Sequence, residues 1–182
     1  MKVVRTDFQG LLVIEPKVYE DHRGFFLETF NRQRYLEAGV DLDFVQDNHS
    51  KSCEGTIRGL HYQLPNPQGK LIWAIDGVIF DVAVDMRSGS STFGRSFTIL
   101  LSSTNRLQVY IPPGFAHGFC VISEVAEIVY KCTSFHRPEF EHVLRWNDPE
   151  LLIDWPVKEP KLSQRDCIGL AFKDAPQFSS IM

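Results

Sequence analysis

The 182-residue sequence lacks the features of several large protein classes. It has no apolar run long enough to span a membrane, and its first residues lack the apolar stretch of a secretory signal peptide. It has no basic run either, since the formal net charge is −4 and acidic and basic residues are interleaved along the chain. We therefore expect neither nucleic acid nor membrane as a partner.

Cysteine is sparse, and no Cys-x-x-Cys pair occurs. We therefore expect reduced thiols in a cytoplasmic protein and no cysteine-based zinc site. The sequence also has no complete P-loop, no Gly-x-Gly-x-x-Gly fingerprint, no Gly-x-Ser-x-Gly elbow and no His-Glu-x-x-His motif. These absences argue against a Rossmann dehydrogenase, a P-loop enzyme, an α/β hydrolase and a zinc protease.

The sequence does contain many short β-branched and aromatic runs, separated by Gly, Pro, Asn and Ser. This pattern is typical of a mainly β protein, a sandwich or a barrel with a few short helices. One helix is predicted between Asn31, which can cap it, and Gly39, which can end it, and a shorter one around 163–169. Because no composition shift marks a boundary, we expect one domain over residues 1–182, with an irregular tail from about residue 155.

Three segments concentrate polar side chains among apolar ones: 21–30 (DHRGFFLETF), 46–70 (beginning QDNHSKS) and 110–119 (YIPPGFAHGF). Within the second segment, Arg58 and His61 would point to opposite faces of one extended strand. Neither face of that strand is a clean apolar stripe. A strand of this kind is either misread or lines a site.

Two further features have an ordinary structural explanation beside a functional one. In the run IFDVAVDM, Asp81 and Asp85 lie on the face opposite to the apolar side chains. Two acids on one face usually mean a solvated outer surface, which we expect for Asp85, whereas lining a cavity stays open for Asp81. His117 has apolar neighbours, and a lone histidine there is more often structural than catalytic.

The segment PPGFAHGF has the Pro-x-Gly-x-x-His form of the second motif of cupins, jelly-roll barrels that often hold a metal. The first cupin motif supplies His-x-His, whereas this chain has His61-Tyr62-Gln63. A neutral amide is a poor ligand for a transition metal beside imidazoles. The resemblance implies a double-stranded β-helix, or jelly-roll barrel, and we expect it to work without a metal or other cofactor.

Taken together, the segments resemble the dTDP-4-dehydrorhamnose 3,5-epimerases, metal-free cupins of deoxysugar biosynthesis. The resemblance runs nearly end to end and rests on the order and spacing of DHRGFFLETF, QDNHSKSCEGTIRGLHYQ, Lys70, FDVAVDMRSGSSTFG, PPGFAHGF, Tyr130, WNDPELLIDWP and LSQRD. It implies epimerisation of dTDP-4-dehydro-6-deoxy-D-glucose at C3 and C5, through an enolate, to dTDP-4-dehydro-L-rhamnose.

The resemblance implies four catalytic residues. His61 would be the base, a role that suits an imidazole at neutral pH, and Asp166 would orient it. Tyr130 would return a proton from the opposite face of the sugar, and Lys70 would stabilise the oxyanion that develops at O4. Without the family, Asp166 would be read as a helix-cap residue.

The resemblance also implies a substrate-binding set: Arg23, Phe26, Glu28, Gln46, Asn48, Arg58, Asp81, His117 and Arg165. The arginines Arg23 and Arg58 would hold the diphosphate, because a guanidinium suits bidentate phosphate contacts. A homodimer with shared active sites is implied as well. The residues expected to cross its interface are Arg23, Phe26 and Glu28, while Glu28, Gln46 and Asn48 would meet the thymidine.

One position departs from the family pattern, because His136 stands where an aromatic residue is usual. The change leaves open an epimerase that acts at C3 alone. Two interpretations from other classes also remain. One is a metal-dependent cupin dioxygenase, which His61-Tyr62-Gln63 argues against, and the other is a non-catalytic sugar-nucleotide-binding cupin.

Overall fold

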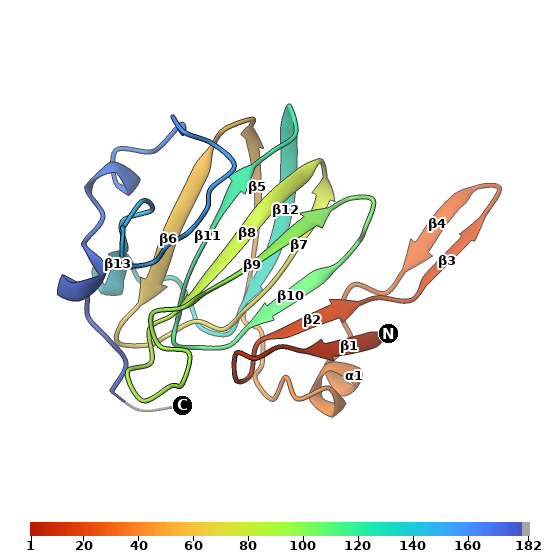
Figure 1. The fold of residues 1–182 in the computed structure, drawn as a ribbon. Coiled ribbons are helices and arrows are strands. Elements are labelled where there is room, and N and C mark those ends of the chain that lie inside the picture. Colours follow the sequence, from red (N-terminus) through yellow and green to blue (C-terminus); the bar gives the residue numbers. More distant parts are fainter. Residues whose placement is uncertain (180–182) are drawn as a thin grey trace.

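The computed structural model describes residues 1–179 and contains two antiparallel sheets that face each other (Figure 1). The six-stranded sheet has the order β1 (Lys2–Arg5), β2 (Leu12–Glu15), β10 (Gln108–Ile111), β7 (Lys70–Asp76), β12 (Val125–Cys132), β5 (Gln46–Cys53). The five-stranded sheet has the order β13 (Glu141–Val143), β6 (Ile57–Gln63), β11 (Phe115–Val121), β8 (Val78–Asp85), β9 (Ser96–Ser102). Two such layers form a jelly-roll barrel, so the predicted fold class is confirmed.

A separate two-stranded hairpin, β3 (Val18–Asp21) and β4 (Gly24–Leu27), extends away from both sheets (Figure 1). The predicted helix is present as α1 (Arg32–Glu37), and the Asn31 side chain caps it by accepting a hydrogen bond from the Arg34 backbone N–H. Three short 3₁₀ helices complete the described elements: η1 (Pro138–Phe140), η2 (Asp166–Ile168) and η3 (Phe172–Asp174). Residues 180–182 of the predicted tail lie outside the described residues.

The main core fills the space between the two sheets. Ile72 and Ile111 from the six-stranded sheet meet Ile79 and Leu101 from the five-stranded sheet, and all four are buried. Burial of such side chains is the main favourable contribution to folding, roughly 1.5–3 kcal/mol for each. This core closes one part of the barrel and leaves another part for polar side chains.

The outer face of the five-stranded sheet is covered by the C-terminal part of the chain. Val82 and Val84 pack there against Leu151 and Phe178. The alternate residues of β8, including Asp81 and Asp85, therefore face the inside of the barrel and have no exposed surface. The expectation of a solvated face is wrong for Asp85, because the covered outer face is the apolar one. Asp81, for which the sequence left the question open, lies on the same inner face.

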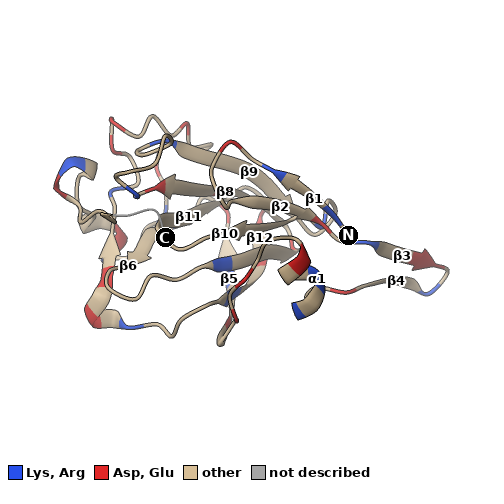
Figure 2. Cartoon of the chain, turned by 90° about the horizontal axis from the view of Figure 1, so that it is seen from below, with Lys and Arg blue, Asp and Glu red and all other residues tan. Residues whose placement is uncertain are grey.

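Charge is spread over the whole fold. Figure 2 shows lysine and arginine interspersed with aspartate and glutamate on the chain, with no extended block of one sign. Among residues 1–179, no helix has the length and the apolar character that crossing a bilayer requires.

Candidate active site

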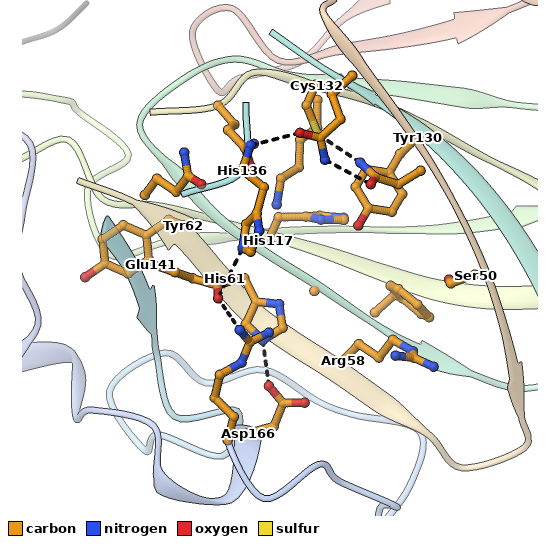
Figure 3. Close-up of a pocket in the computed structure, with 18 of the residues that line it drawn as sticks. Ser50, Arg58, His61, Tyr62, His117, Tyr130, Cys132, His136, Glu141 and Asp166 are labelled. Atoms are coloured by element: carbon orange, nitrogen blue, oxygen red, sulfur yellow. Dashed lines mark hydrogen bonds and ion pairs between the residues drawn. The ribbon is translucent and has the colours of Figure 1, made fainter. Parts of the chain in front are cut away.

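A cavity of about 340 Å³ opens between the two sheets (Figure 3). It brings together most of the predicted site residues: Gln46, Asn48, Arg58, His61, Lys70, His117, Tyr130, Arg165 and Asp166. These residues come from both sheets and from the C-terminal segment. The cavity is therefore a product of the tertiary fold.

Strand β6 places both Arg58 and His61 in this cavity, although a regular strand would point them to opposite faces. The register between β6 and β11 shifts here, since His117 lies opposite His61 while Phe119 lies opposite Arg58. A bulge of this kind adds a residue and re-aims the side chains that follow it. The prediction of opposite faces is therefore wrong, and the irregular strand builds the site.

The bulge requires two glycines, Gly59 on β6 and Gly118 on β11, where these paired strands approach each other closely. Gly59 has φ of +126°, and a Cβ atom there would lie 2.5 Å from the Gly118 Cα. Only glycine combines this backbone conformation with so close an approach of two chains. The backbone conformation and the close packing of β6 on β11 therefore require the glycine at position 59, two residues before His61.

His61 forms a dyad with Asp166, the first residue of η2. The distance between His61 Nε2 and Asp166 Oδ1 is 2.6 Å, and Ser163 Oγ donates a second hydrogen bond of 2.7 Å to Asp166 Oδ2. Burial alone would raise the pKa of Asp166, but the hydrogen bonds from His61 and Ser163 outweigh it and lower that pKa. An ionised carboxylate on Nε2 leaves Nδ1 of a neutral imidazole free to accept a proton.

Tyr130 and Lys70 lie on the opposite sheet. Burial raises the pKa of Tyr130, so the phenol holds its proton at neutral pH. Burial lowers the pKa of Lys70, against the opposing effect of Cys132, which lies directly across from it on β12. Lys70 is nine-tenths buried, and within residues 1–179 its ammonium group has no hydrogen bond or ion pair.

A second histidine–carboxylate pair lies beside the first. His117 Nε2 is 2.9 Å from Asp81 Oδ2, and burial lowers the pKa of His117 below that of a free histidine. His117 lines the cavity, whereas Asp81 lies behind it and does not. Asp81 therefore reaches the cavity only through the imidazole of His117.

Other polar side chains of the cavity wall bind neighbouring protein groups. Gln46 Nε2 donates to Asn48 Oδ1 at 3.0 Å, and Gln46 Oε1 accepts from the backbone N–H of His136 at 2.9 Å. Arg58 Nε donates to Ser52 Oγ at 2.9 Å, which leaves its terminal nitrogens for other partners. These groups offer donors and acceptors to a polar ligand.

Three predicted residues lie away from the cavity of their own chain. Arg23 and Phe26 are on the projecting hairpin, where Arg23 pairs with Asp21 and Phe26 is 70% exposed. Glu28 follows the hairpin and binds Arg34. The structure does not bring these three to the other site residues within one subunit.

Sequence reasoning missed Glu141, which lines the cavity and binds Arg165. Glu141 and Glu139 are alternate acids in the same short run, and only the pairing of β13 with β6 distinguishes them. Within residues 1–179, no group of three or more His, Cys, Asp or Glu side chains is arranged to hold a metal ion. Three histidines line the cavity, and each lies against a carboxylate: His61 against Asp166, His117 against Asp81 and His136 against Glu141.

Comparison with known proteins decides the family. The model of the dTDP-4-dehydrorhamnose 3,5-epimerase family matches residues 5–174. The chain belongs to this family. The enzyme of that name from Pseudomonas aeruginosa is 52% identical over 180 residues, which are 98% of this chain and 99% of the relative.

Solved structures agree with this assignment. The Legionella pneumophila dTDP-6-deoxy-D-glucose-3,5-epimerase, in complex with dTDP-4-keto-L-rhamnose, is 44% identical with a TM-score of 0.96, covering 100% of this chain and 99% of that one. ChmJ, a 3′-monoepimerase from Streptomyces bikiniensis in complex with dTDP-quinovose, is 34% identical with a TM-score of 0.87, covering 92% and 86%. The family resemblance read from the sequence is confirmed.

Proposed function

We propose that the chain is a cofactor-independent isomerase that epimerises dTDP-4-dehydro-6-deoxy-D-glucose at C3 and C5 to give dTDP-4-dehydro-L-rhamnose. One observation carries the proposal. His61 and Tyr130 come from opposite sheets and face one cavity, and Asp166 of η2 binds His61 there. Epimerisation needs this arrangement, since one group must take a proton from one face of the sugar and another must return a proton to the other face.

The base in this mechanism is His61. The C4 carbonyl acidifies the hydrogens on C3 and C5, and Nδ1 of the imidazole takes one of them while Nε2 stays bound to Asp166. The carbon–hydrogen electron pair moves into the ring and leaves an enolate at O4. The carboxylate of Asp166 then stabilises the imidazolium that has formed.

The enolate is stabilised by Lys70 and is reprotonated by Tyr130. Among residues 1–179 the Lys70 ammonium has no protein partner, and a largely buried cation of this kind gains most from a charge that appears only during the reaction. Tyr130 keeps its proton because burial raises its pKa, and it gives that proton to the enolate carbon. His61 then releases its proton to solvent and the Tyr130 phenolate takes one back, and the same steps at the second carbon complete the reaction.

Arg58 is the cation of this cavity that suits the diphosphate, with Arg23 expected from the partner subunit. Arg165 adds a further positive charge to the cavity wall, and Gln46 and Asn48 offer amides to the thymidine. His117 lines the cavity from β11, and its Nδ1 faces the sugar when Nε2–H is bonded to Asp81. Asp81 contributes by fixing this tautomer, so its place in the predicted substrate-binding set is indirect.

A homodimer with shared sites is part of the proposal. The hairpin exposes Tyr19, Phe25 and Phe26 together, a surface that a second copy of the chain would cover. Its arginine, Arg23, would then reach the cavity of the partner, with Phe26 and Glu28 beside it. We further propose one domain and a cytoplasmic location, supported by the free state of all four cysteines.

A second candidate function is epimerisation at C3 alone. His136 at the cavity rim and the similarity to the Streptomyces monoepimerase favour it, whereas the higher identity to 3,5-epimerases favours two carbons. Proton NMR of the substrate with the protein and a metal chelator in deuterated water separates the two. Deuterium at C3 and C5 supports the proposal, deuterium at C3 alone supports the alternative, and deuterium at neither contradicts both.

A further inference from the structure

Gln63 is a cavity residue to which the proposed mechanism gives no role. It is the last residue of β6, two positions after His61, where the cupin motif has its second histidine. Its side chain lines the cavity, and the residue is only 2% exposed. A buried amide is costly unless its donors and its acceptor have hydrogen-bond partners. The partners of Gln63 therefore indicate what the residue does.

The hydrogen bonds of the Gln63 amide all go to backbone groups. Nε2 donates to the carbonyl oxygens of Asn66 at 3.0 Å and Phe135 at 3.3 Å. Oε1 accepts from the backbone N–H of Arg137 at 2.7 Å. Because carbonyl groups only accept and N–H groups only donate, these partners fix the orientation of the amide. Gln63 thus joins the loop that follows β6 to the segment that follows β12.

That segment, residues 133–137, is also bound by a second glutamine. Gln68 precedes β7 and donates from Nε2 to the carbonyl oxygen of Ser134 at 2.8 Å. At the start of the segment, the Gly69 N–H donates to Thr133 Oγ1 at 2.7 Å, and the Thr133 N–H donates to the Gly69 carbonyl at 3.0 Å. The segment is therefore fixed to the loop between β6 and β7. Gln63 is the more deeply buried of the two glutamines.

The 133–137 segment carries a backbone donor that reaches the proposed nucleotide-binding amides. The N–H of His136 donates to Gln46 Oε1 at 2.9 Å, and Gln46 Nε2 donates to Asn48 Oδ1 at 3.0 Å (Figure 3). Since a backbone N–H can only donate, it binds the oxygen of Gln46 and leaves the nitrogen for Asn48. The orientation of both amides on β5 thus depends on the position of His136.

We propose that Gln63 is a positioning residue for nucleotide recognition. Its amide fixes the 133–137 segment, and the His136 N–H then sets the orientation in which Gln46 and Asn48 meet the thymidine. The inference deepens the proposed function and rests on it for the identity of the ligand. The hydrogen bonds that carry it are formed by protein groups alone. Asp166 should govern turnover, whereas Gln63 should govern affinity.

Calorimetric titration of the whole chain with dTDP tests this difference. Methionine is close to glutamine in size but makes none of its amide hydrogen bonds. In Gln63→Met the affinity for dTDP should fall roughly tenfold, while kcat at saturating substrate stays within about threefold of the wild type. An unchanged affinity, or a fall in kcat that matches the fall in affinity, would overturn the proposal.

Two other glutamines complete this experiment. Gln33 is exposed on α1, bonds Glu37 at 3.3 Å and, within the described chain, lies outside the cavity lining. Gln33→Met is the matched control and should bind dTDP as the wild type does. Gln68→Met removes one hydrogen bond to the 133–137 segment and should weaken dTDP binding less than Gln63→Met. If Gln63→Met does not fold, an unchanged affinity in Gln68→Met would overturn the proposal.

A double-mutant cycle tests the route from Gln63 to the nucleotide. In Gln46→Met the link to the 133–137 segment is already lost. Adding Gln63→Met to this variant should therefore weaken dTDP binding by less than about twofold, because residues that act through one another are not additive. A further loss as large as that in the single Gln63→Met variant would show that Gln63 acts by another route, which would overturn the proposal.

Amide hydrogen exchange tests the same route without a ligand. In Gln63→Met, exchange followed by ¹⁵N NMR should become faster at the Arg137 N–H and also at the His136 N–H, which Gln63 does not contact directly. Unchanged exchange at His136 would overturn the inference. A wild type that binds dTDP but exchanges no substrate hydrogen would overturn the proposed function and leave the inference standing. A wild type that binds no dTDP would overturn both.

Discussion

His61 and His117 lie directly opposite each other on β6 and β11, yet each is hydrogen-bonded to a different carboxylate, Asp166 and Asp81. The two pairs differ in burial. The His61 side chain is 21% exposed, whereas His117 is 7% exposed and burial lowers its pKa. The more accessible imidazole is suited to move protons, and the deeper one is suited to stay neutral.

Replacing the orienting carboxylate should reduce turnover far more than binding. In Asp166→Asn the His61 imidazole loses the anion that stabilises its protonated form, so kcat should fall by about 10²–10⁴-fold. The affinity for dTDP should change little, because Asp166 does not reach the nucleotide in this account. Steady-state kinetics and calorimetric titration with dTDP measure the two effects, and a fall in affinity that matches the fall in kcat would contradict the assignment.

The same variant has a pH-dependent effect on stability. The folded-state pKa of Asp166 is lowered below its ordinary value of 3.8, so its ionised form stabilises the fold above that pH. The advantage of the wild type over Asp166→Asn should therefore be complete at neutral pH and should disappear as the pH falls through the folded pKa. Urea unfolding at several pH values tests this, and a constant difference down to acid pH would be the contrary result.

Removing the proposed acid should separate proton removal from inversion. Tyr130→Phe keeps His61 intact, so the enzyme still exchanges a substrate hydrogen with deuterated water while product forms at least about 10²-fold more slowly. Proton NMR follows exchange and product in one sample. If exchange and inversion fall by the same factor, Tyr130 is not the group that delivers the second proton.

The β6–β11 bulge should be intolerant of a side chain. Gly59→Ala places a Cβ against Gly118, which costs on the order of 3 kcal/mol of unfolding free energy and misaligns Arg58 and His61. Gly39→Ala is the control, because Gly39 also has positive φ but open space around it. Its cost should be about 1 kcal/mol. Equal losses in the two variants would show that backbone strain, and not the close approach, governs this position.

Shared active sites predict complementation between inactive subunits. Arg23→Ala removes the arginine that the hairpin contributes, and His61→Asn removes the base from the cavity. A mixed dimer would therefore contain one intact site. Refolding the two variants together should restore roughly a quarter of the wild-type activity, because half of the dimers are mixed and each has one good site. An inactive mixture that still forms dimers would mean that Arg23 serves the cavity of its own subunit or none.

Much of the fold could be predicted from the sequence because it depends on local signals. The sequence alone predicted the alternation of apolar and polar side chains in β8 and the helix cap at Asn31. The solvent exposure of Asp85 was predicted wrongly, and that of Asp81 was left open, since the covering of the outer sheet face by Phe178 is a long-range packing event. An alternating pattern shows that two faces differ, and it does not show which face is inside.

The candidate site shows the same contrast between local sequence signals and long-range packing. Residues within continuous motifs, such as His61 and Lys70, were found, and the structure places them in one cavity. The shared orientation of Arg58 and His61 could not be predicted, because a bulge has no clear signal in one strand alone. Glu141 was missed because its position depends on pairing with a strand that lies far from it in the sequence.

The most direct test of the account is the rate of deuterium incorporation at C3 and C5 of dTDP-4-dehydro-6-deoxy-D-glucose, followed by proton NMR for the wild type, His61→Asn and His49→Asn. His49 is an exposed histidine that pairs with Glu127 outside the cavity, so its variant controls for the loss of an imidazole. We predict exchange at both carbons for the wild type and His49→Asn, and a loss of at least about 10²-fold at both carbons for His61→Asn. Undiminished exchange in a folded His61→Asn protein would contradict the assignment of His61 as the base.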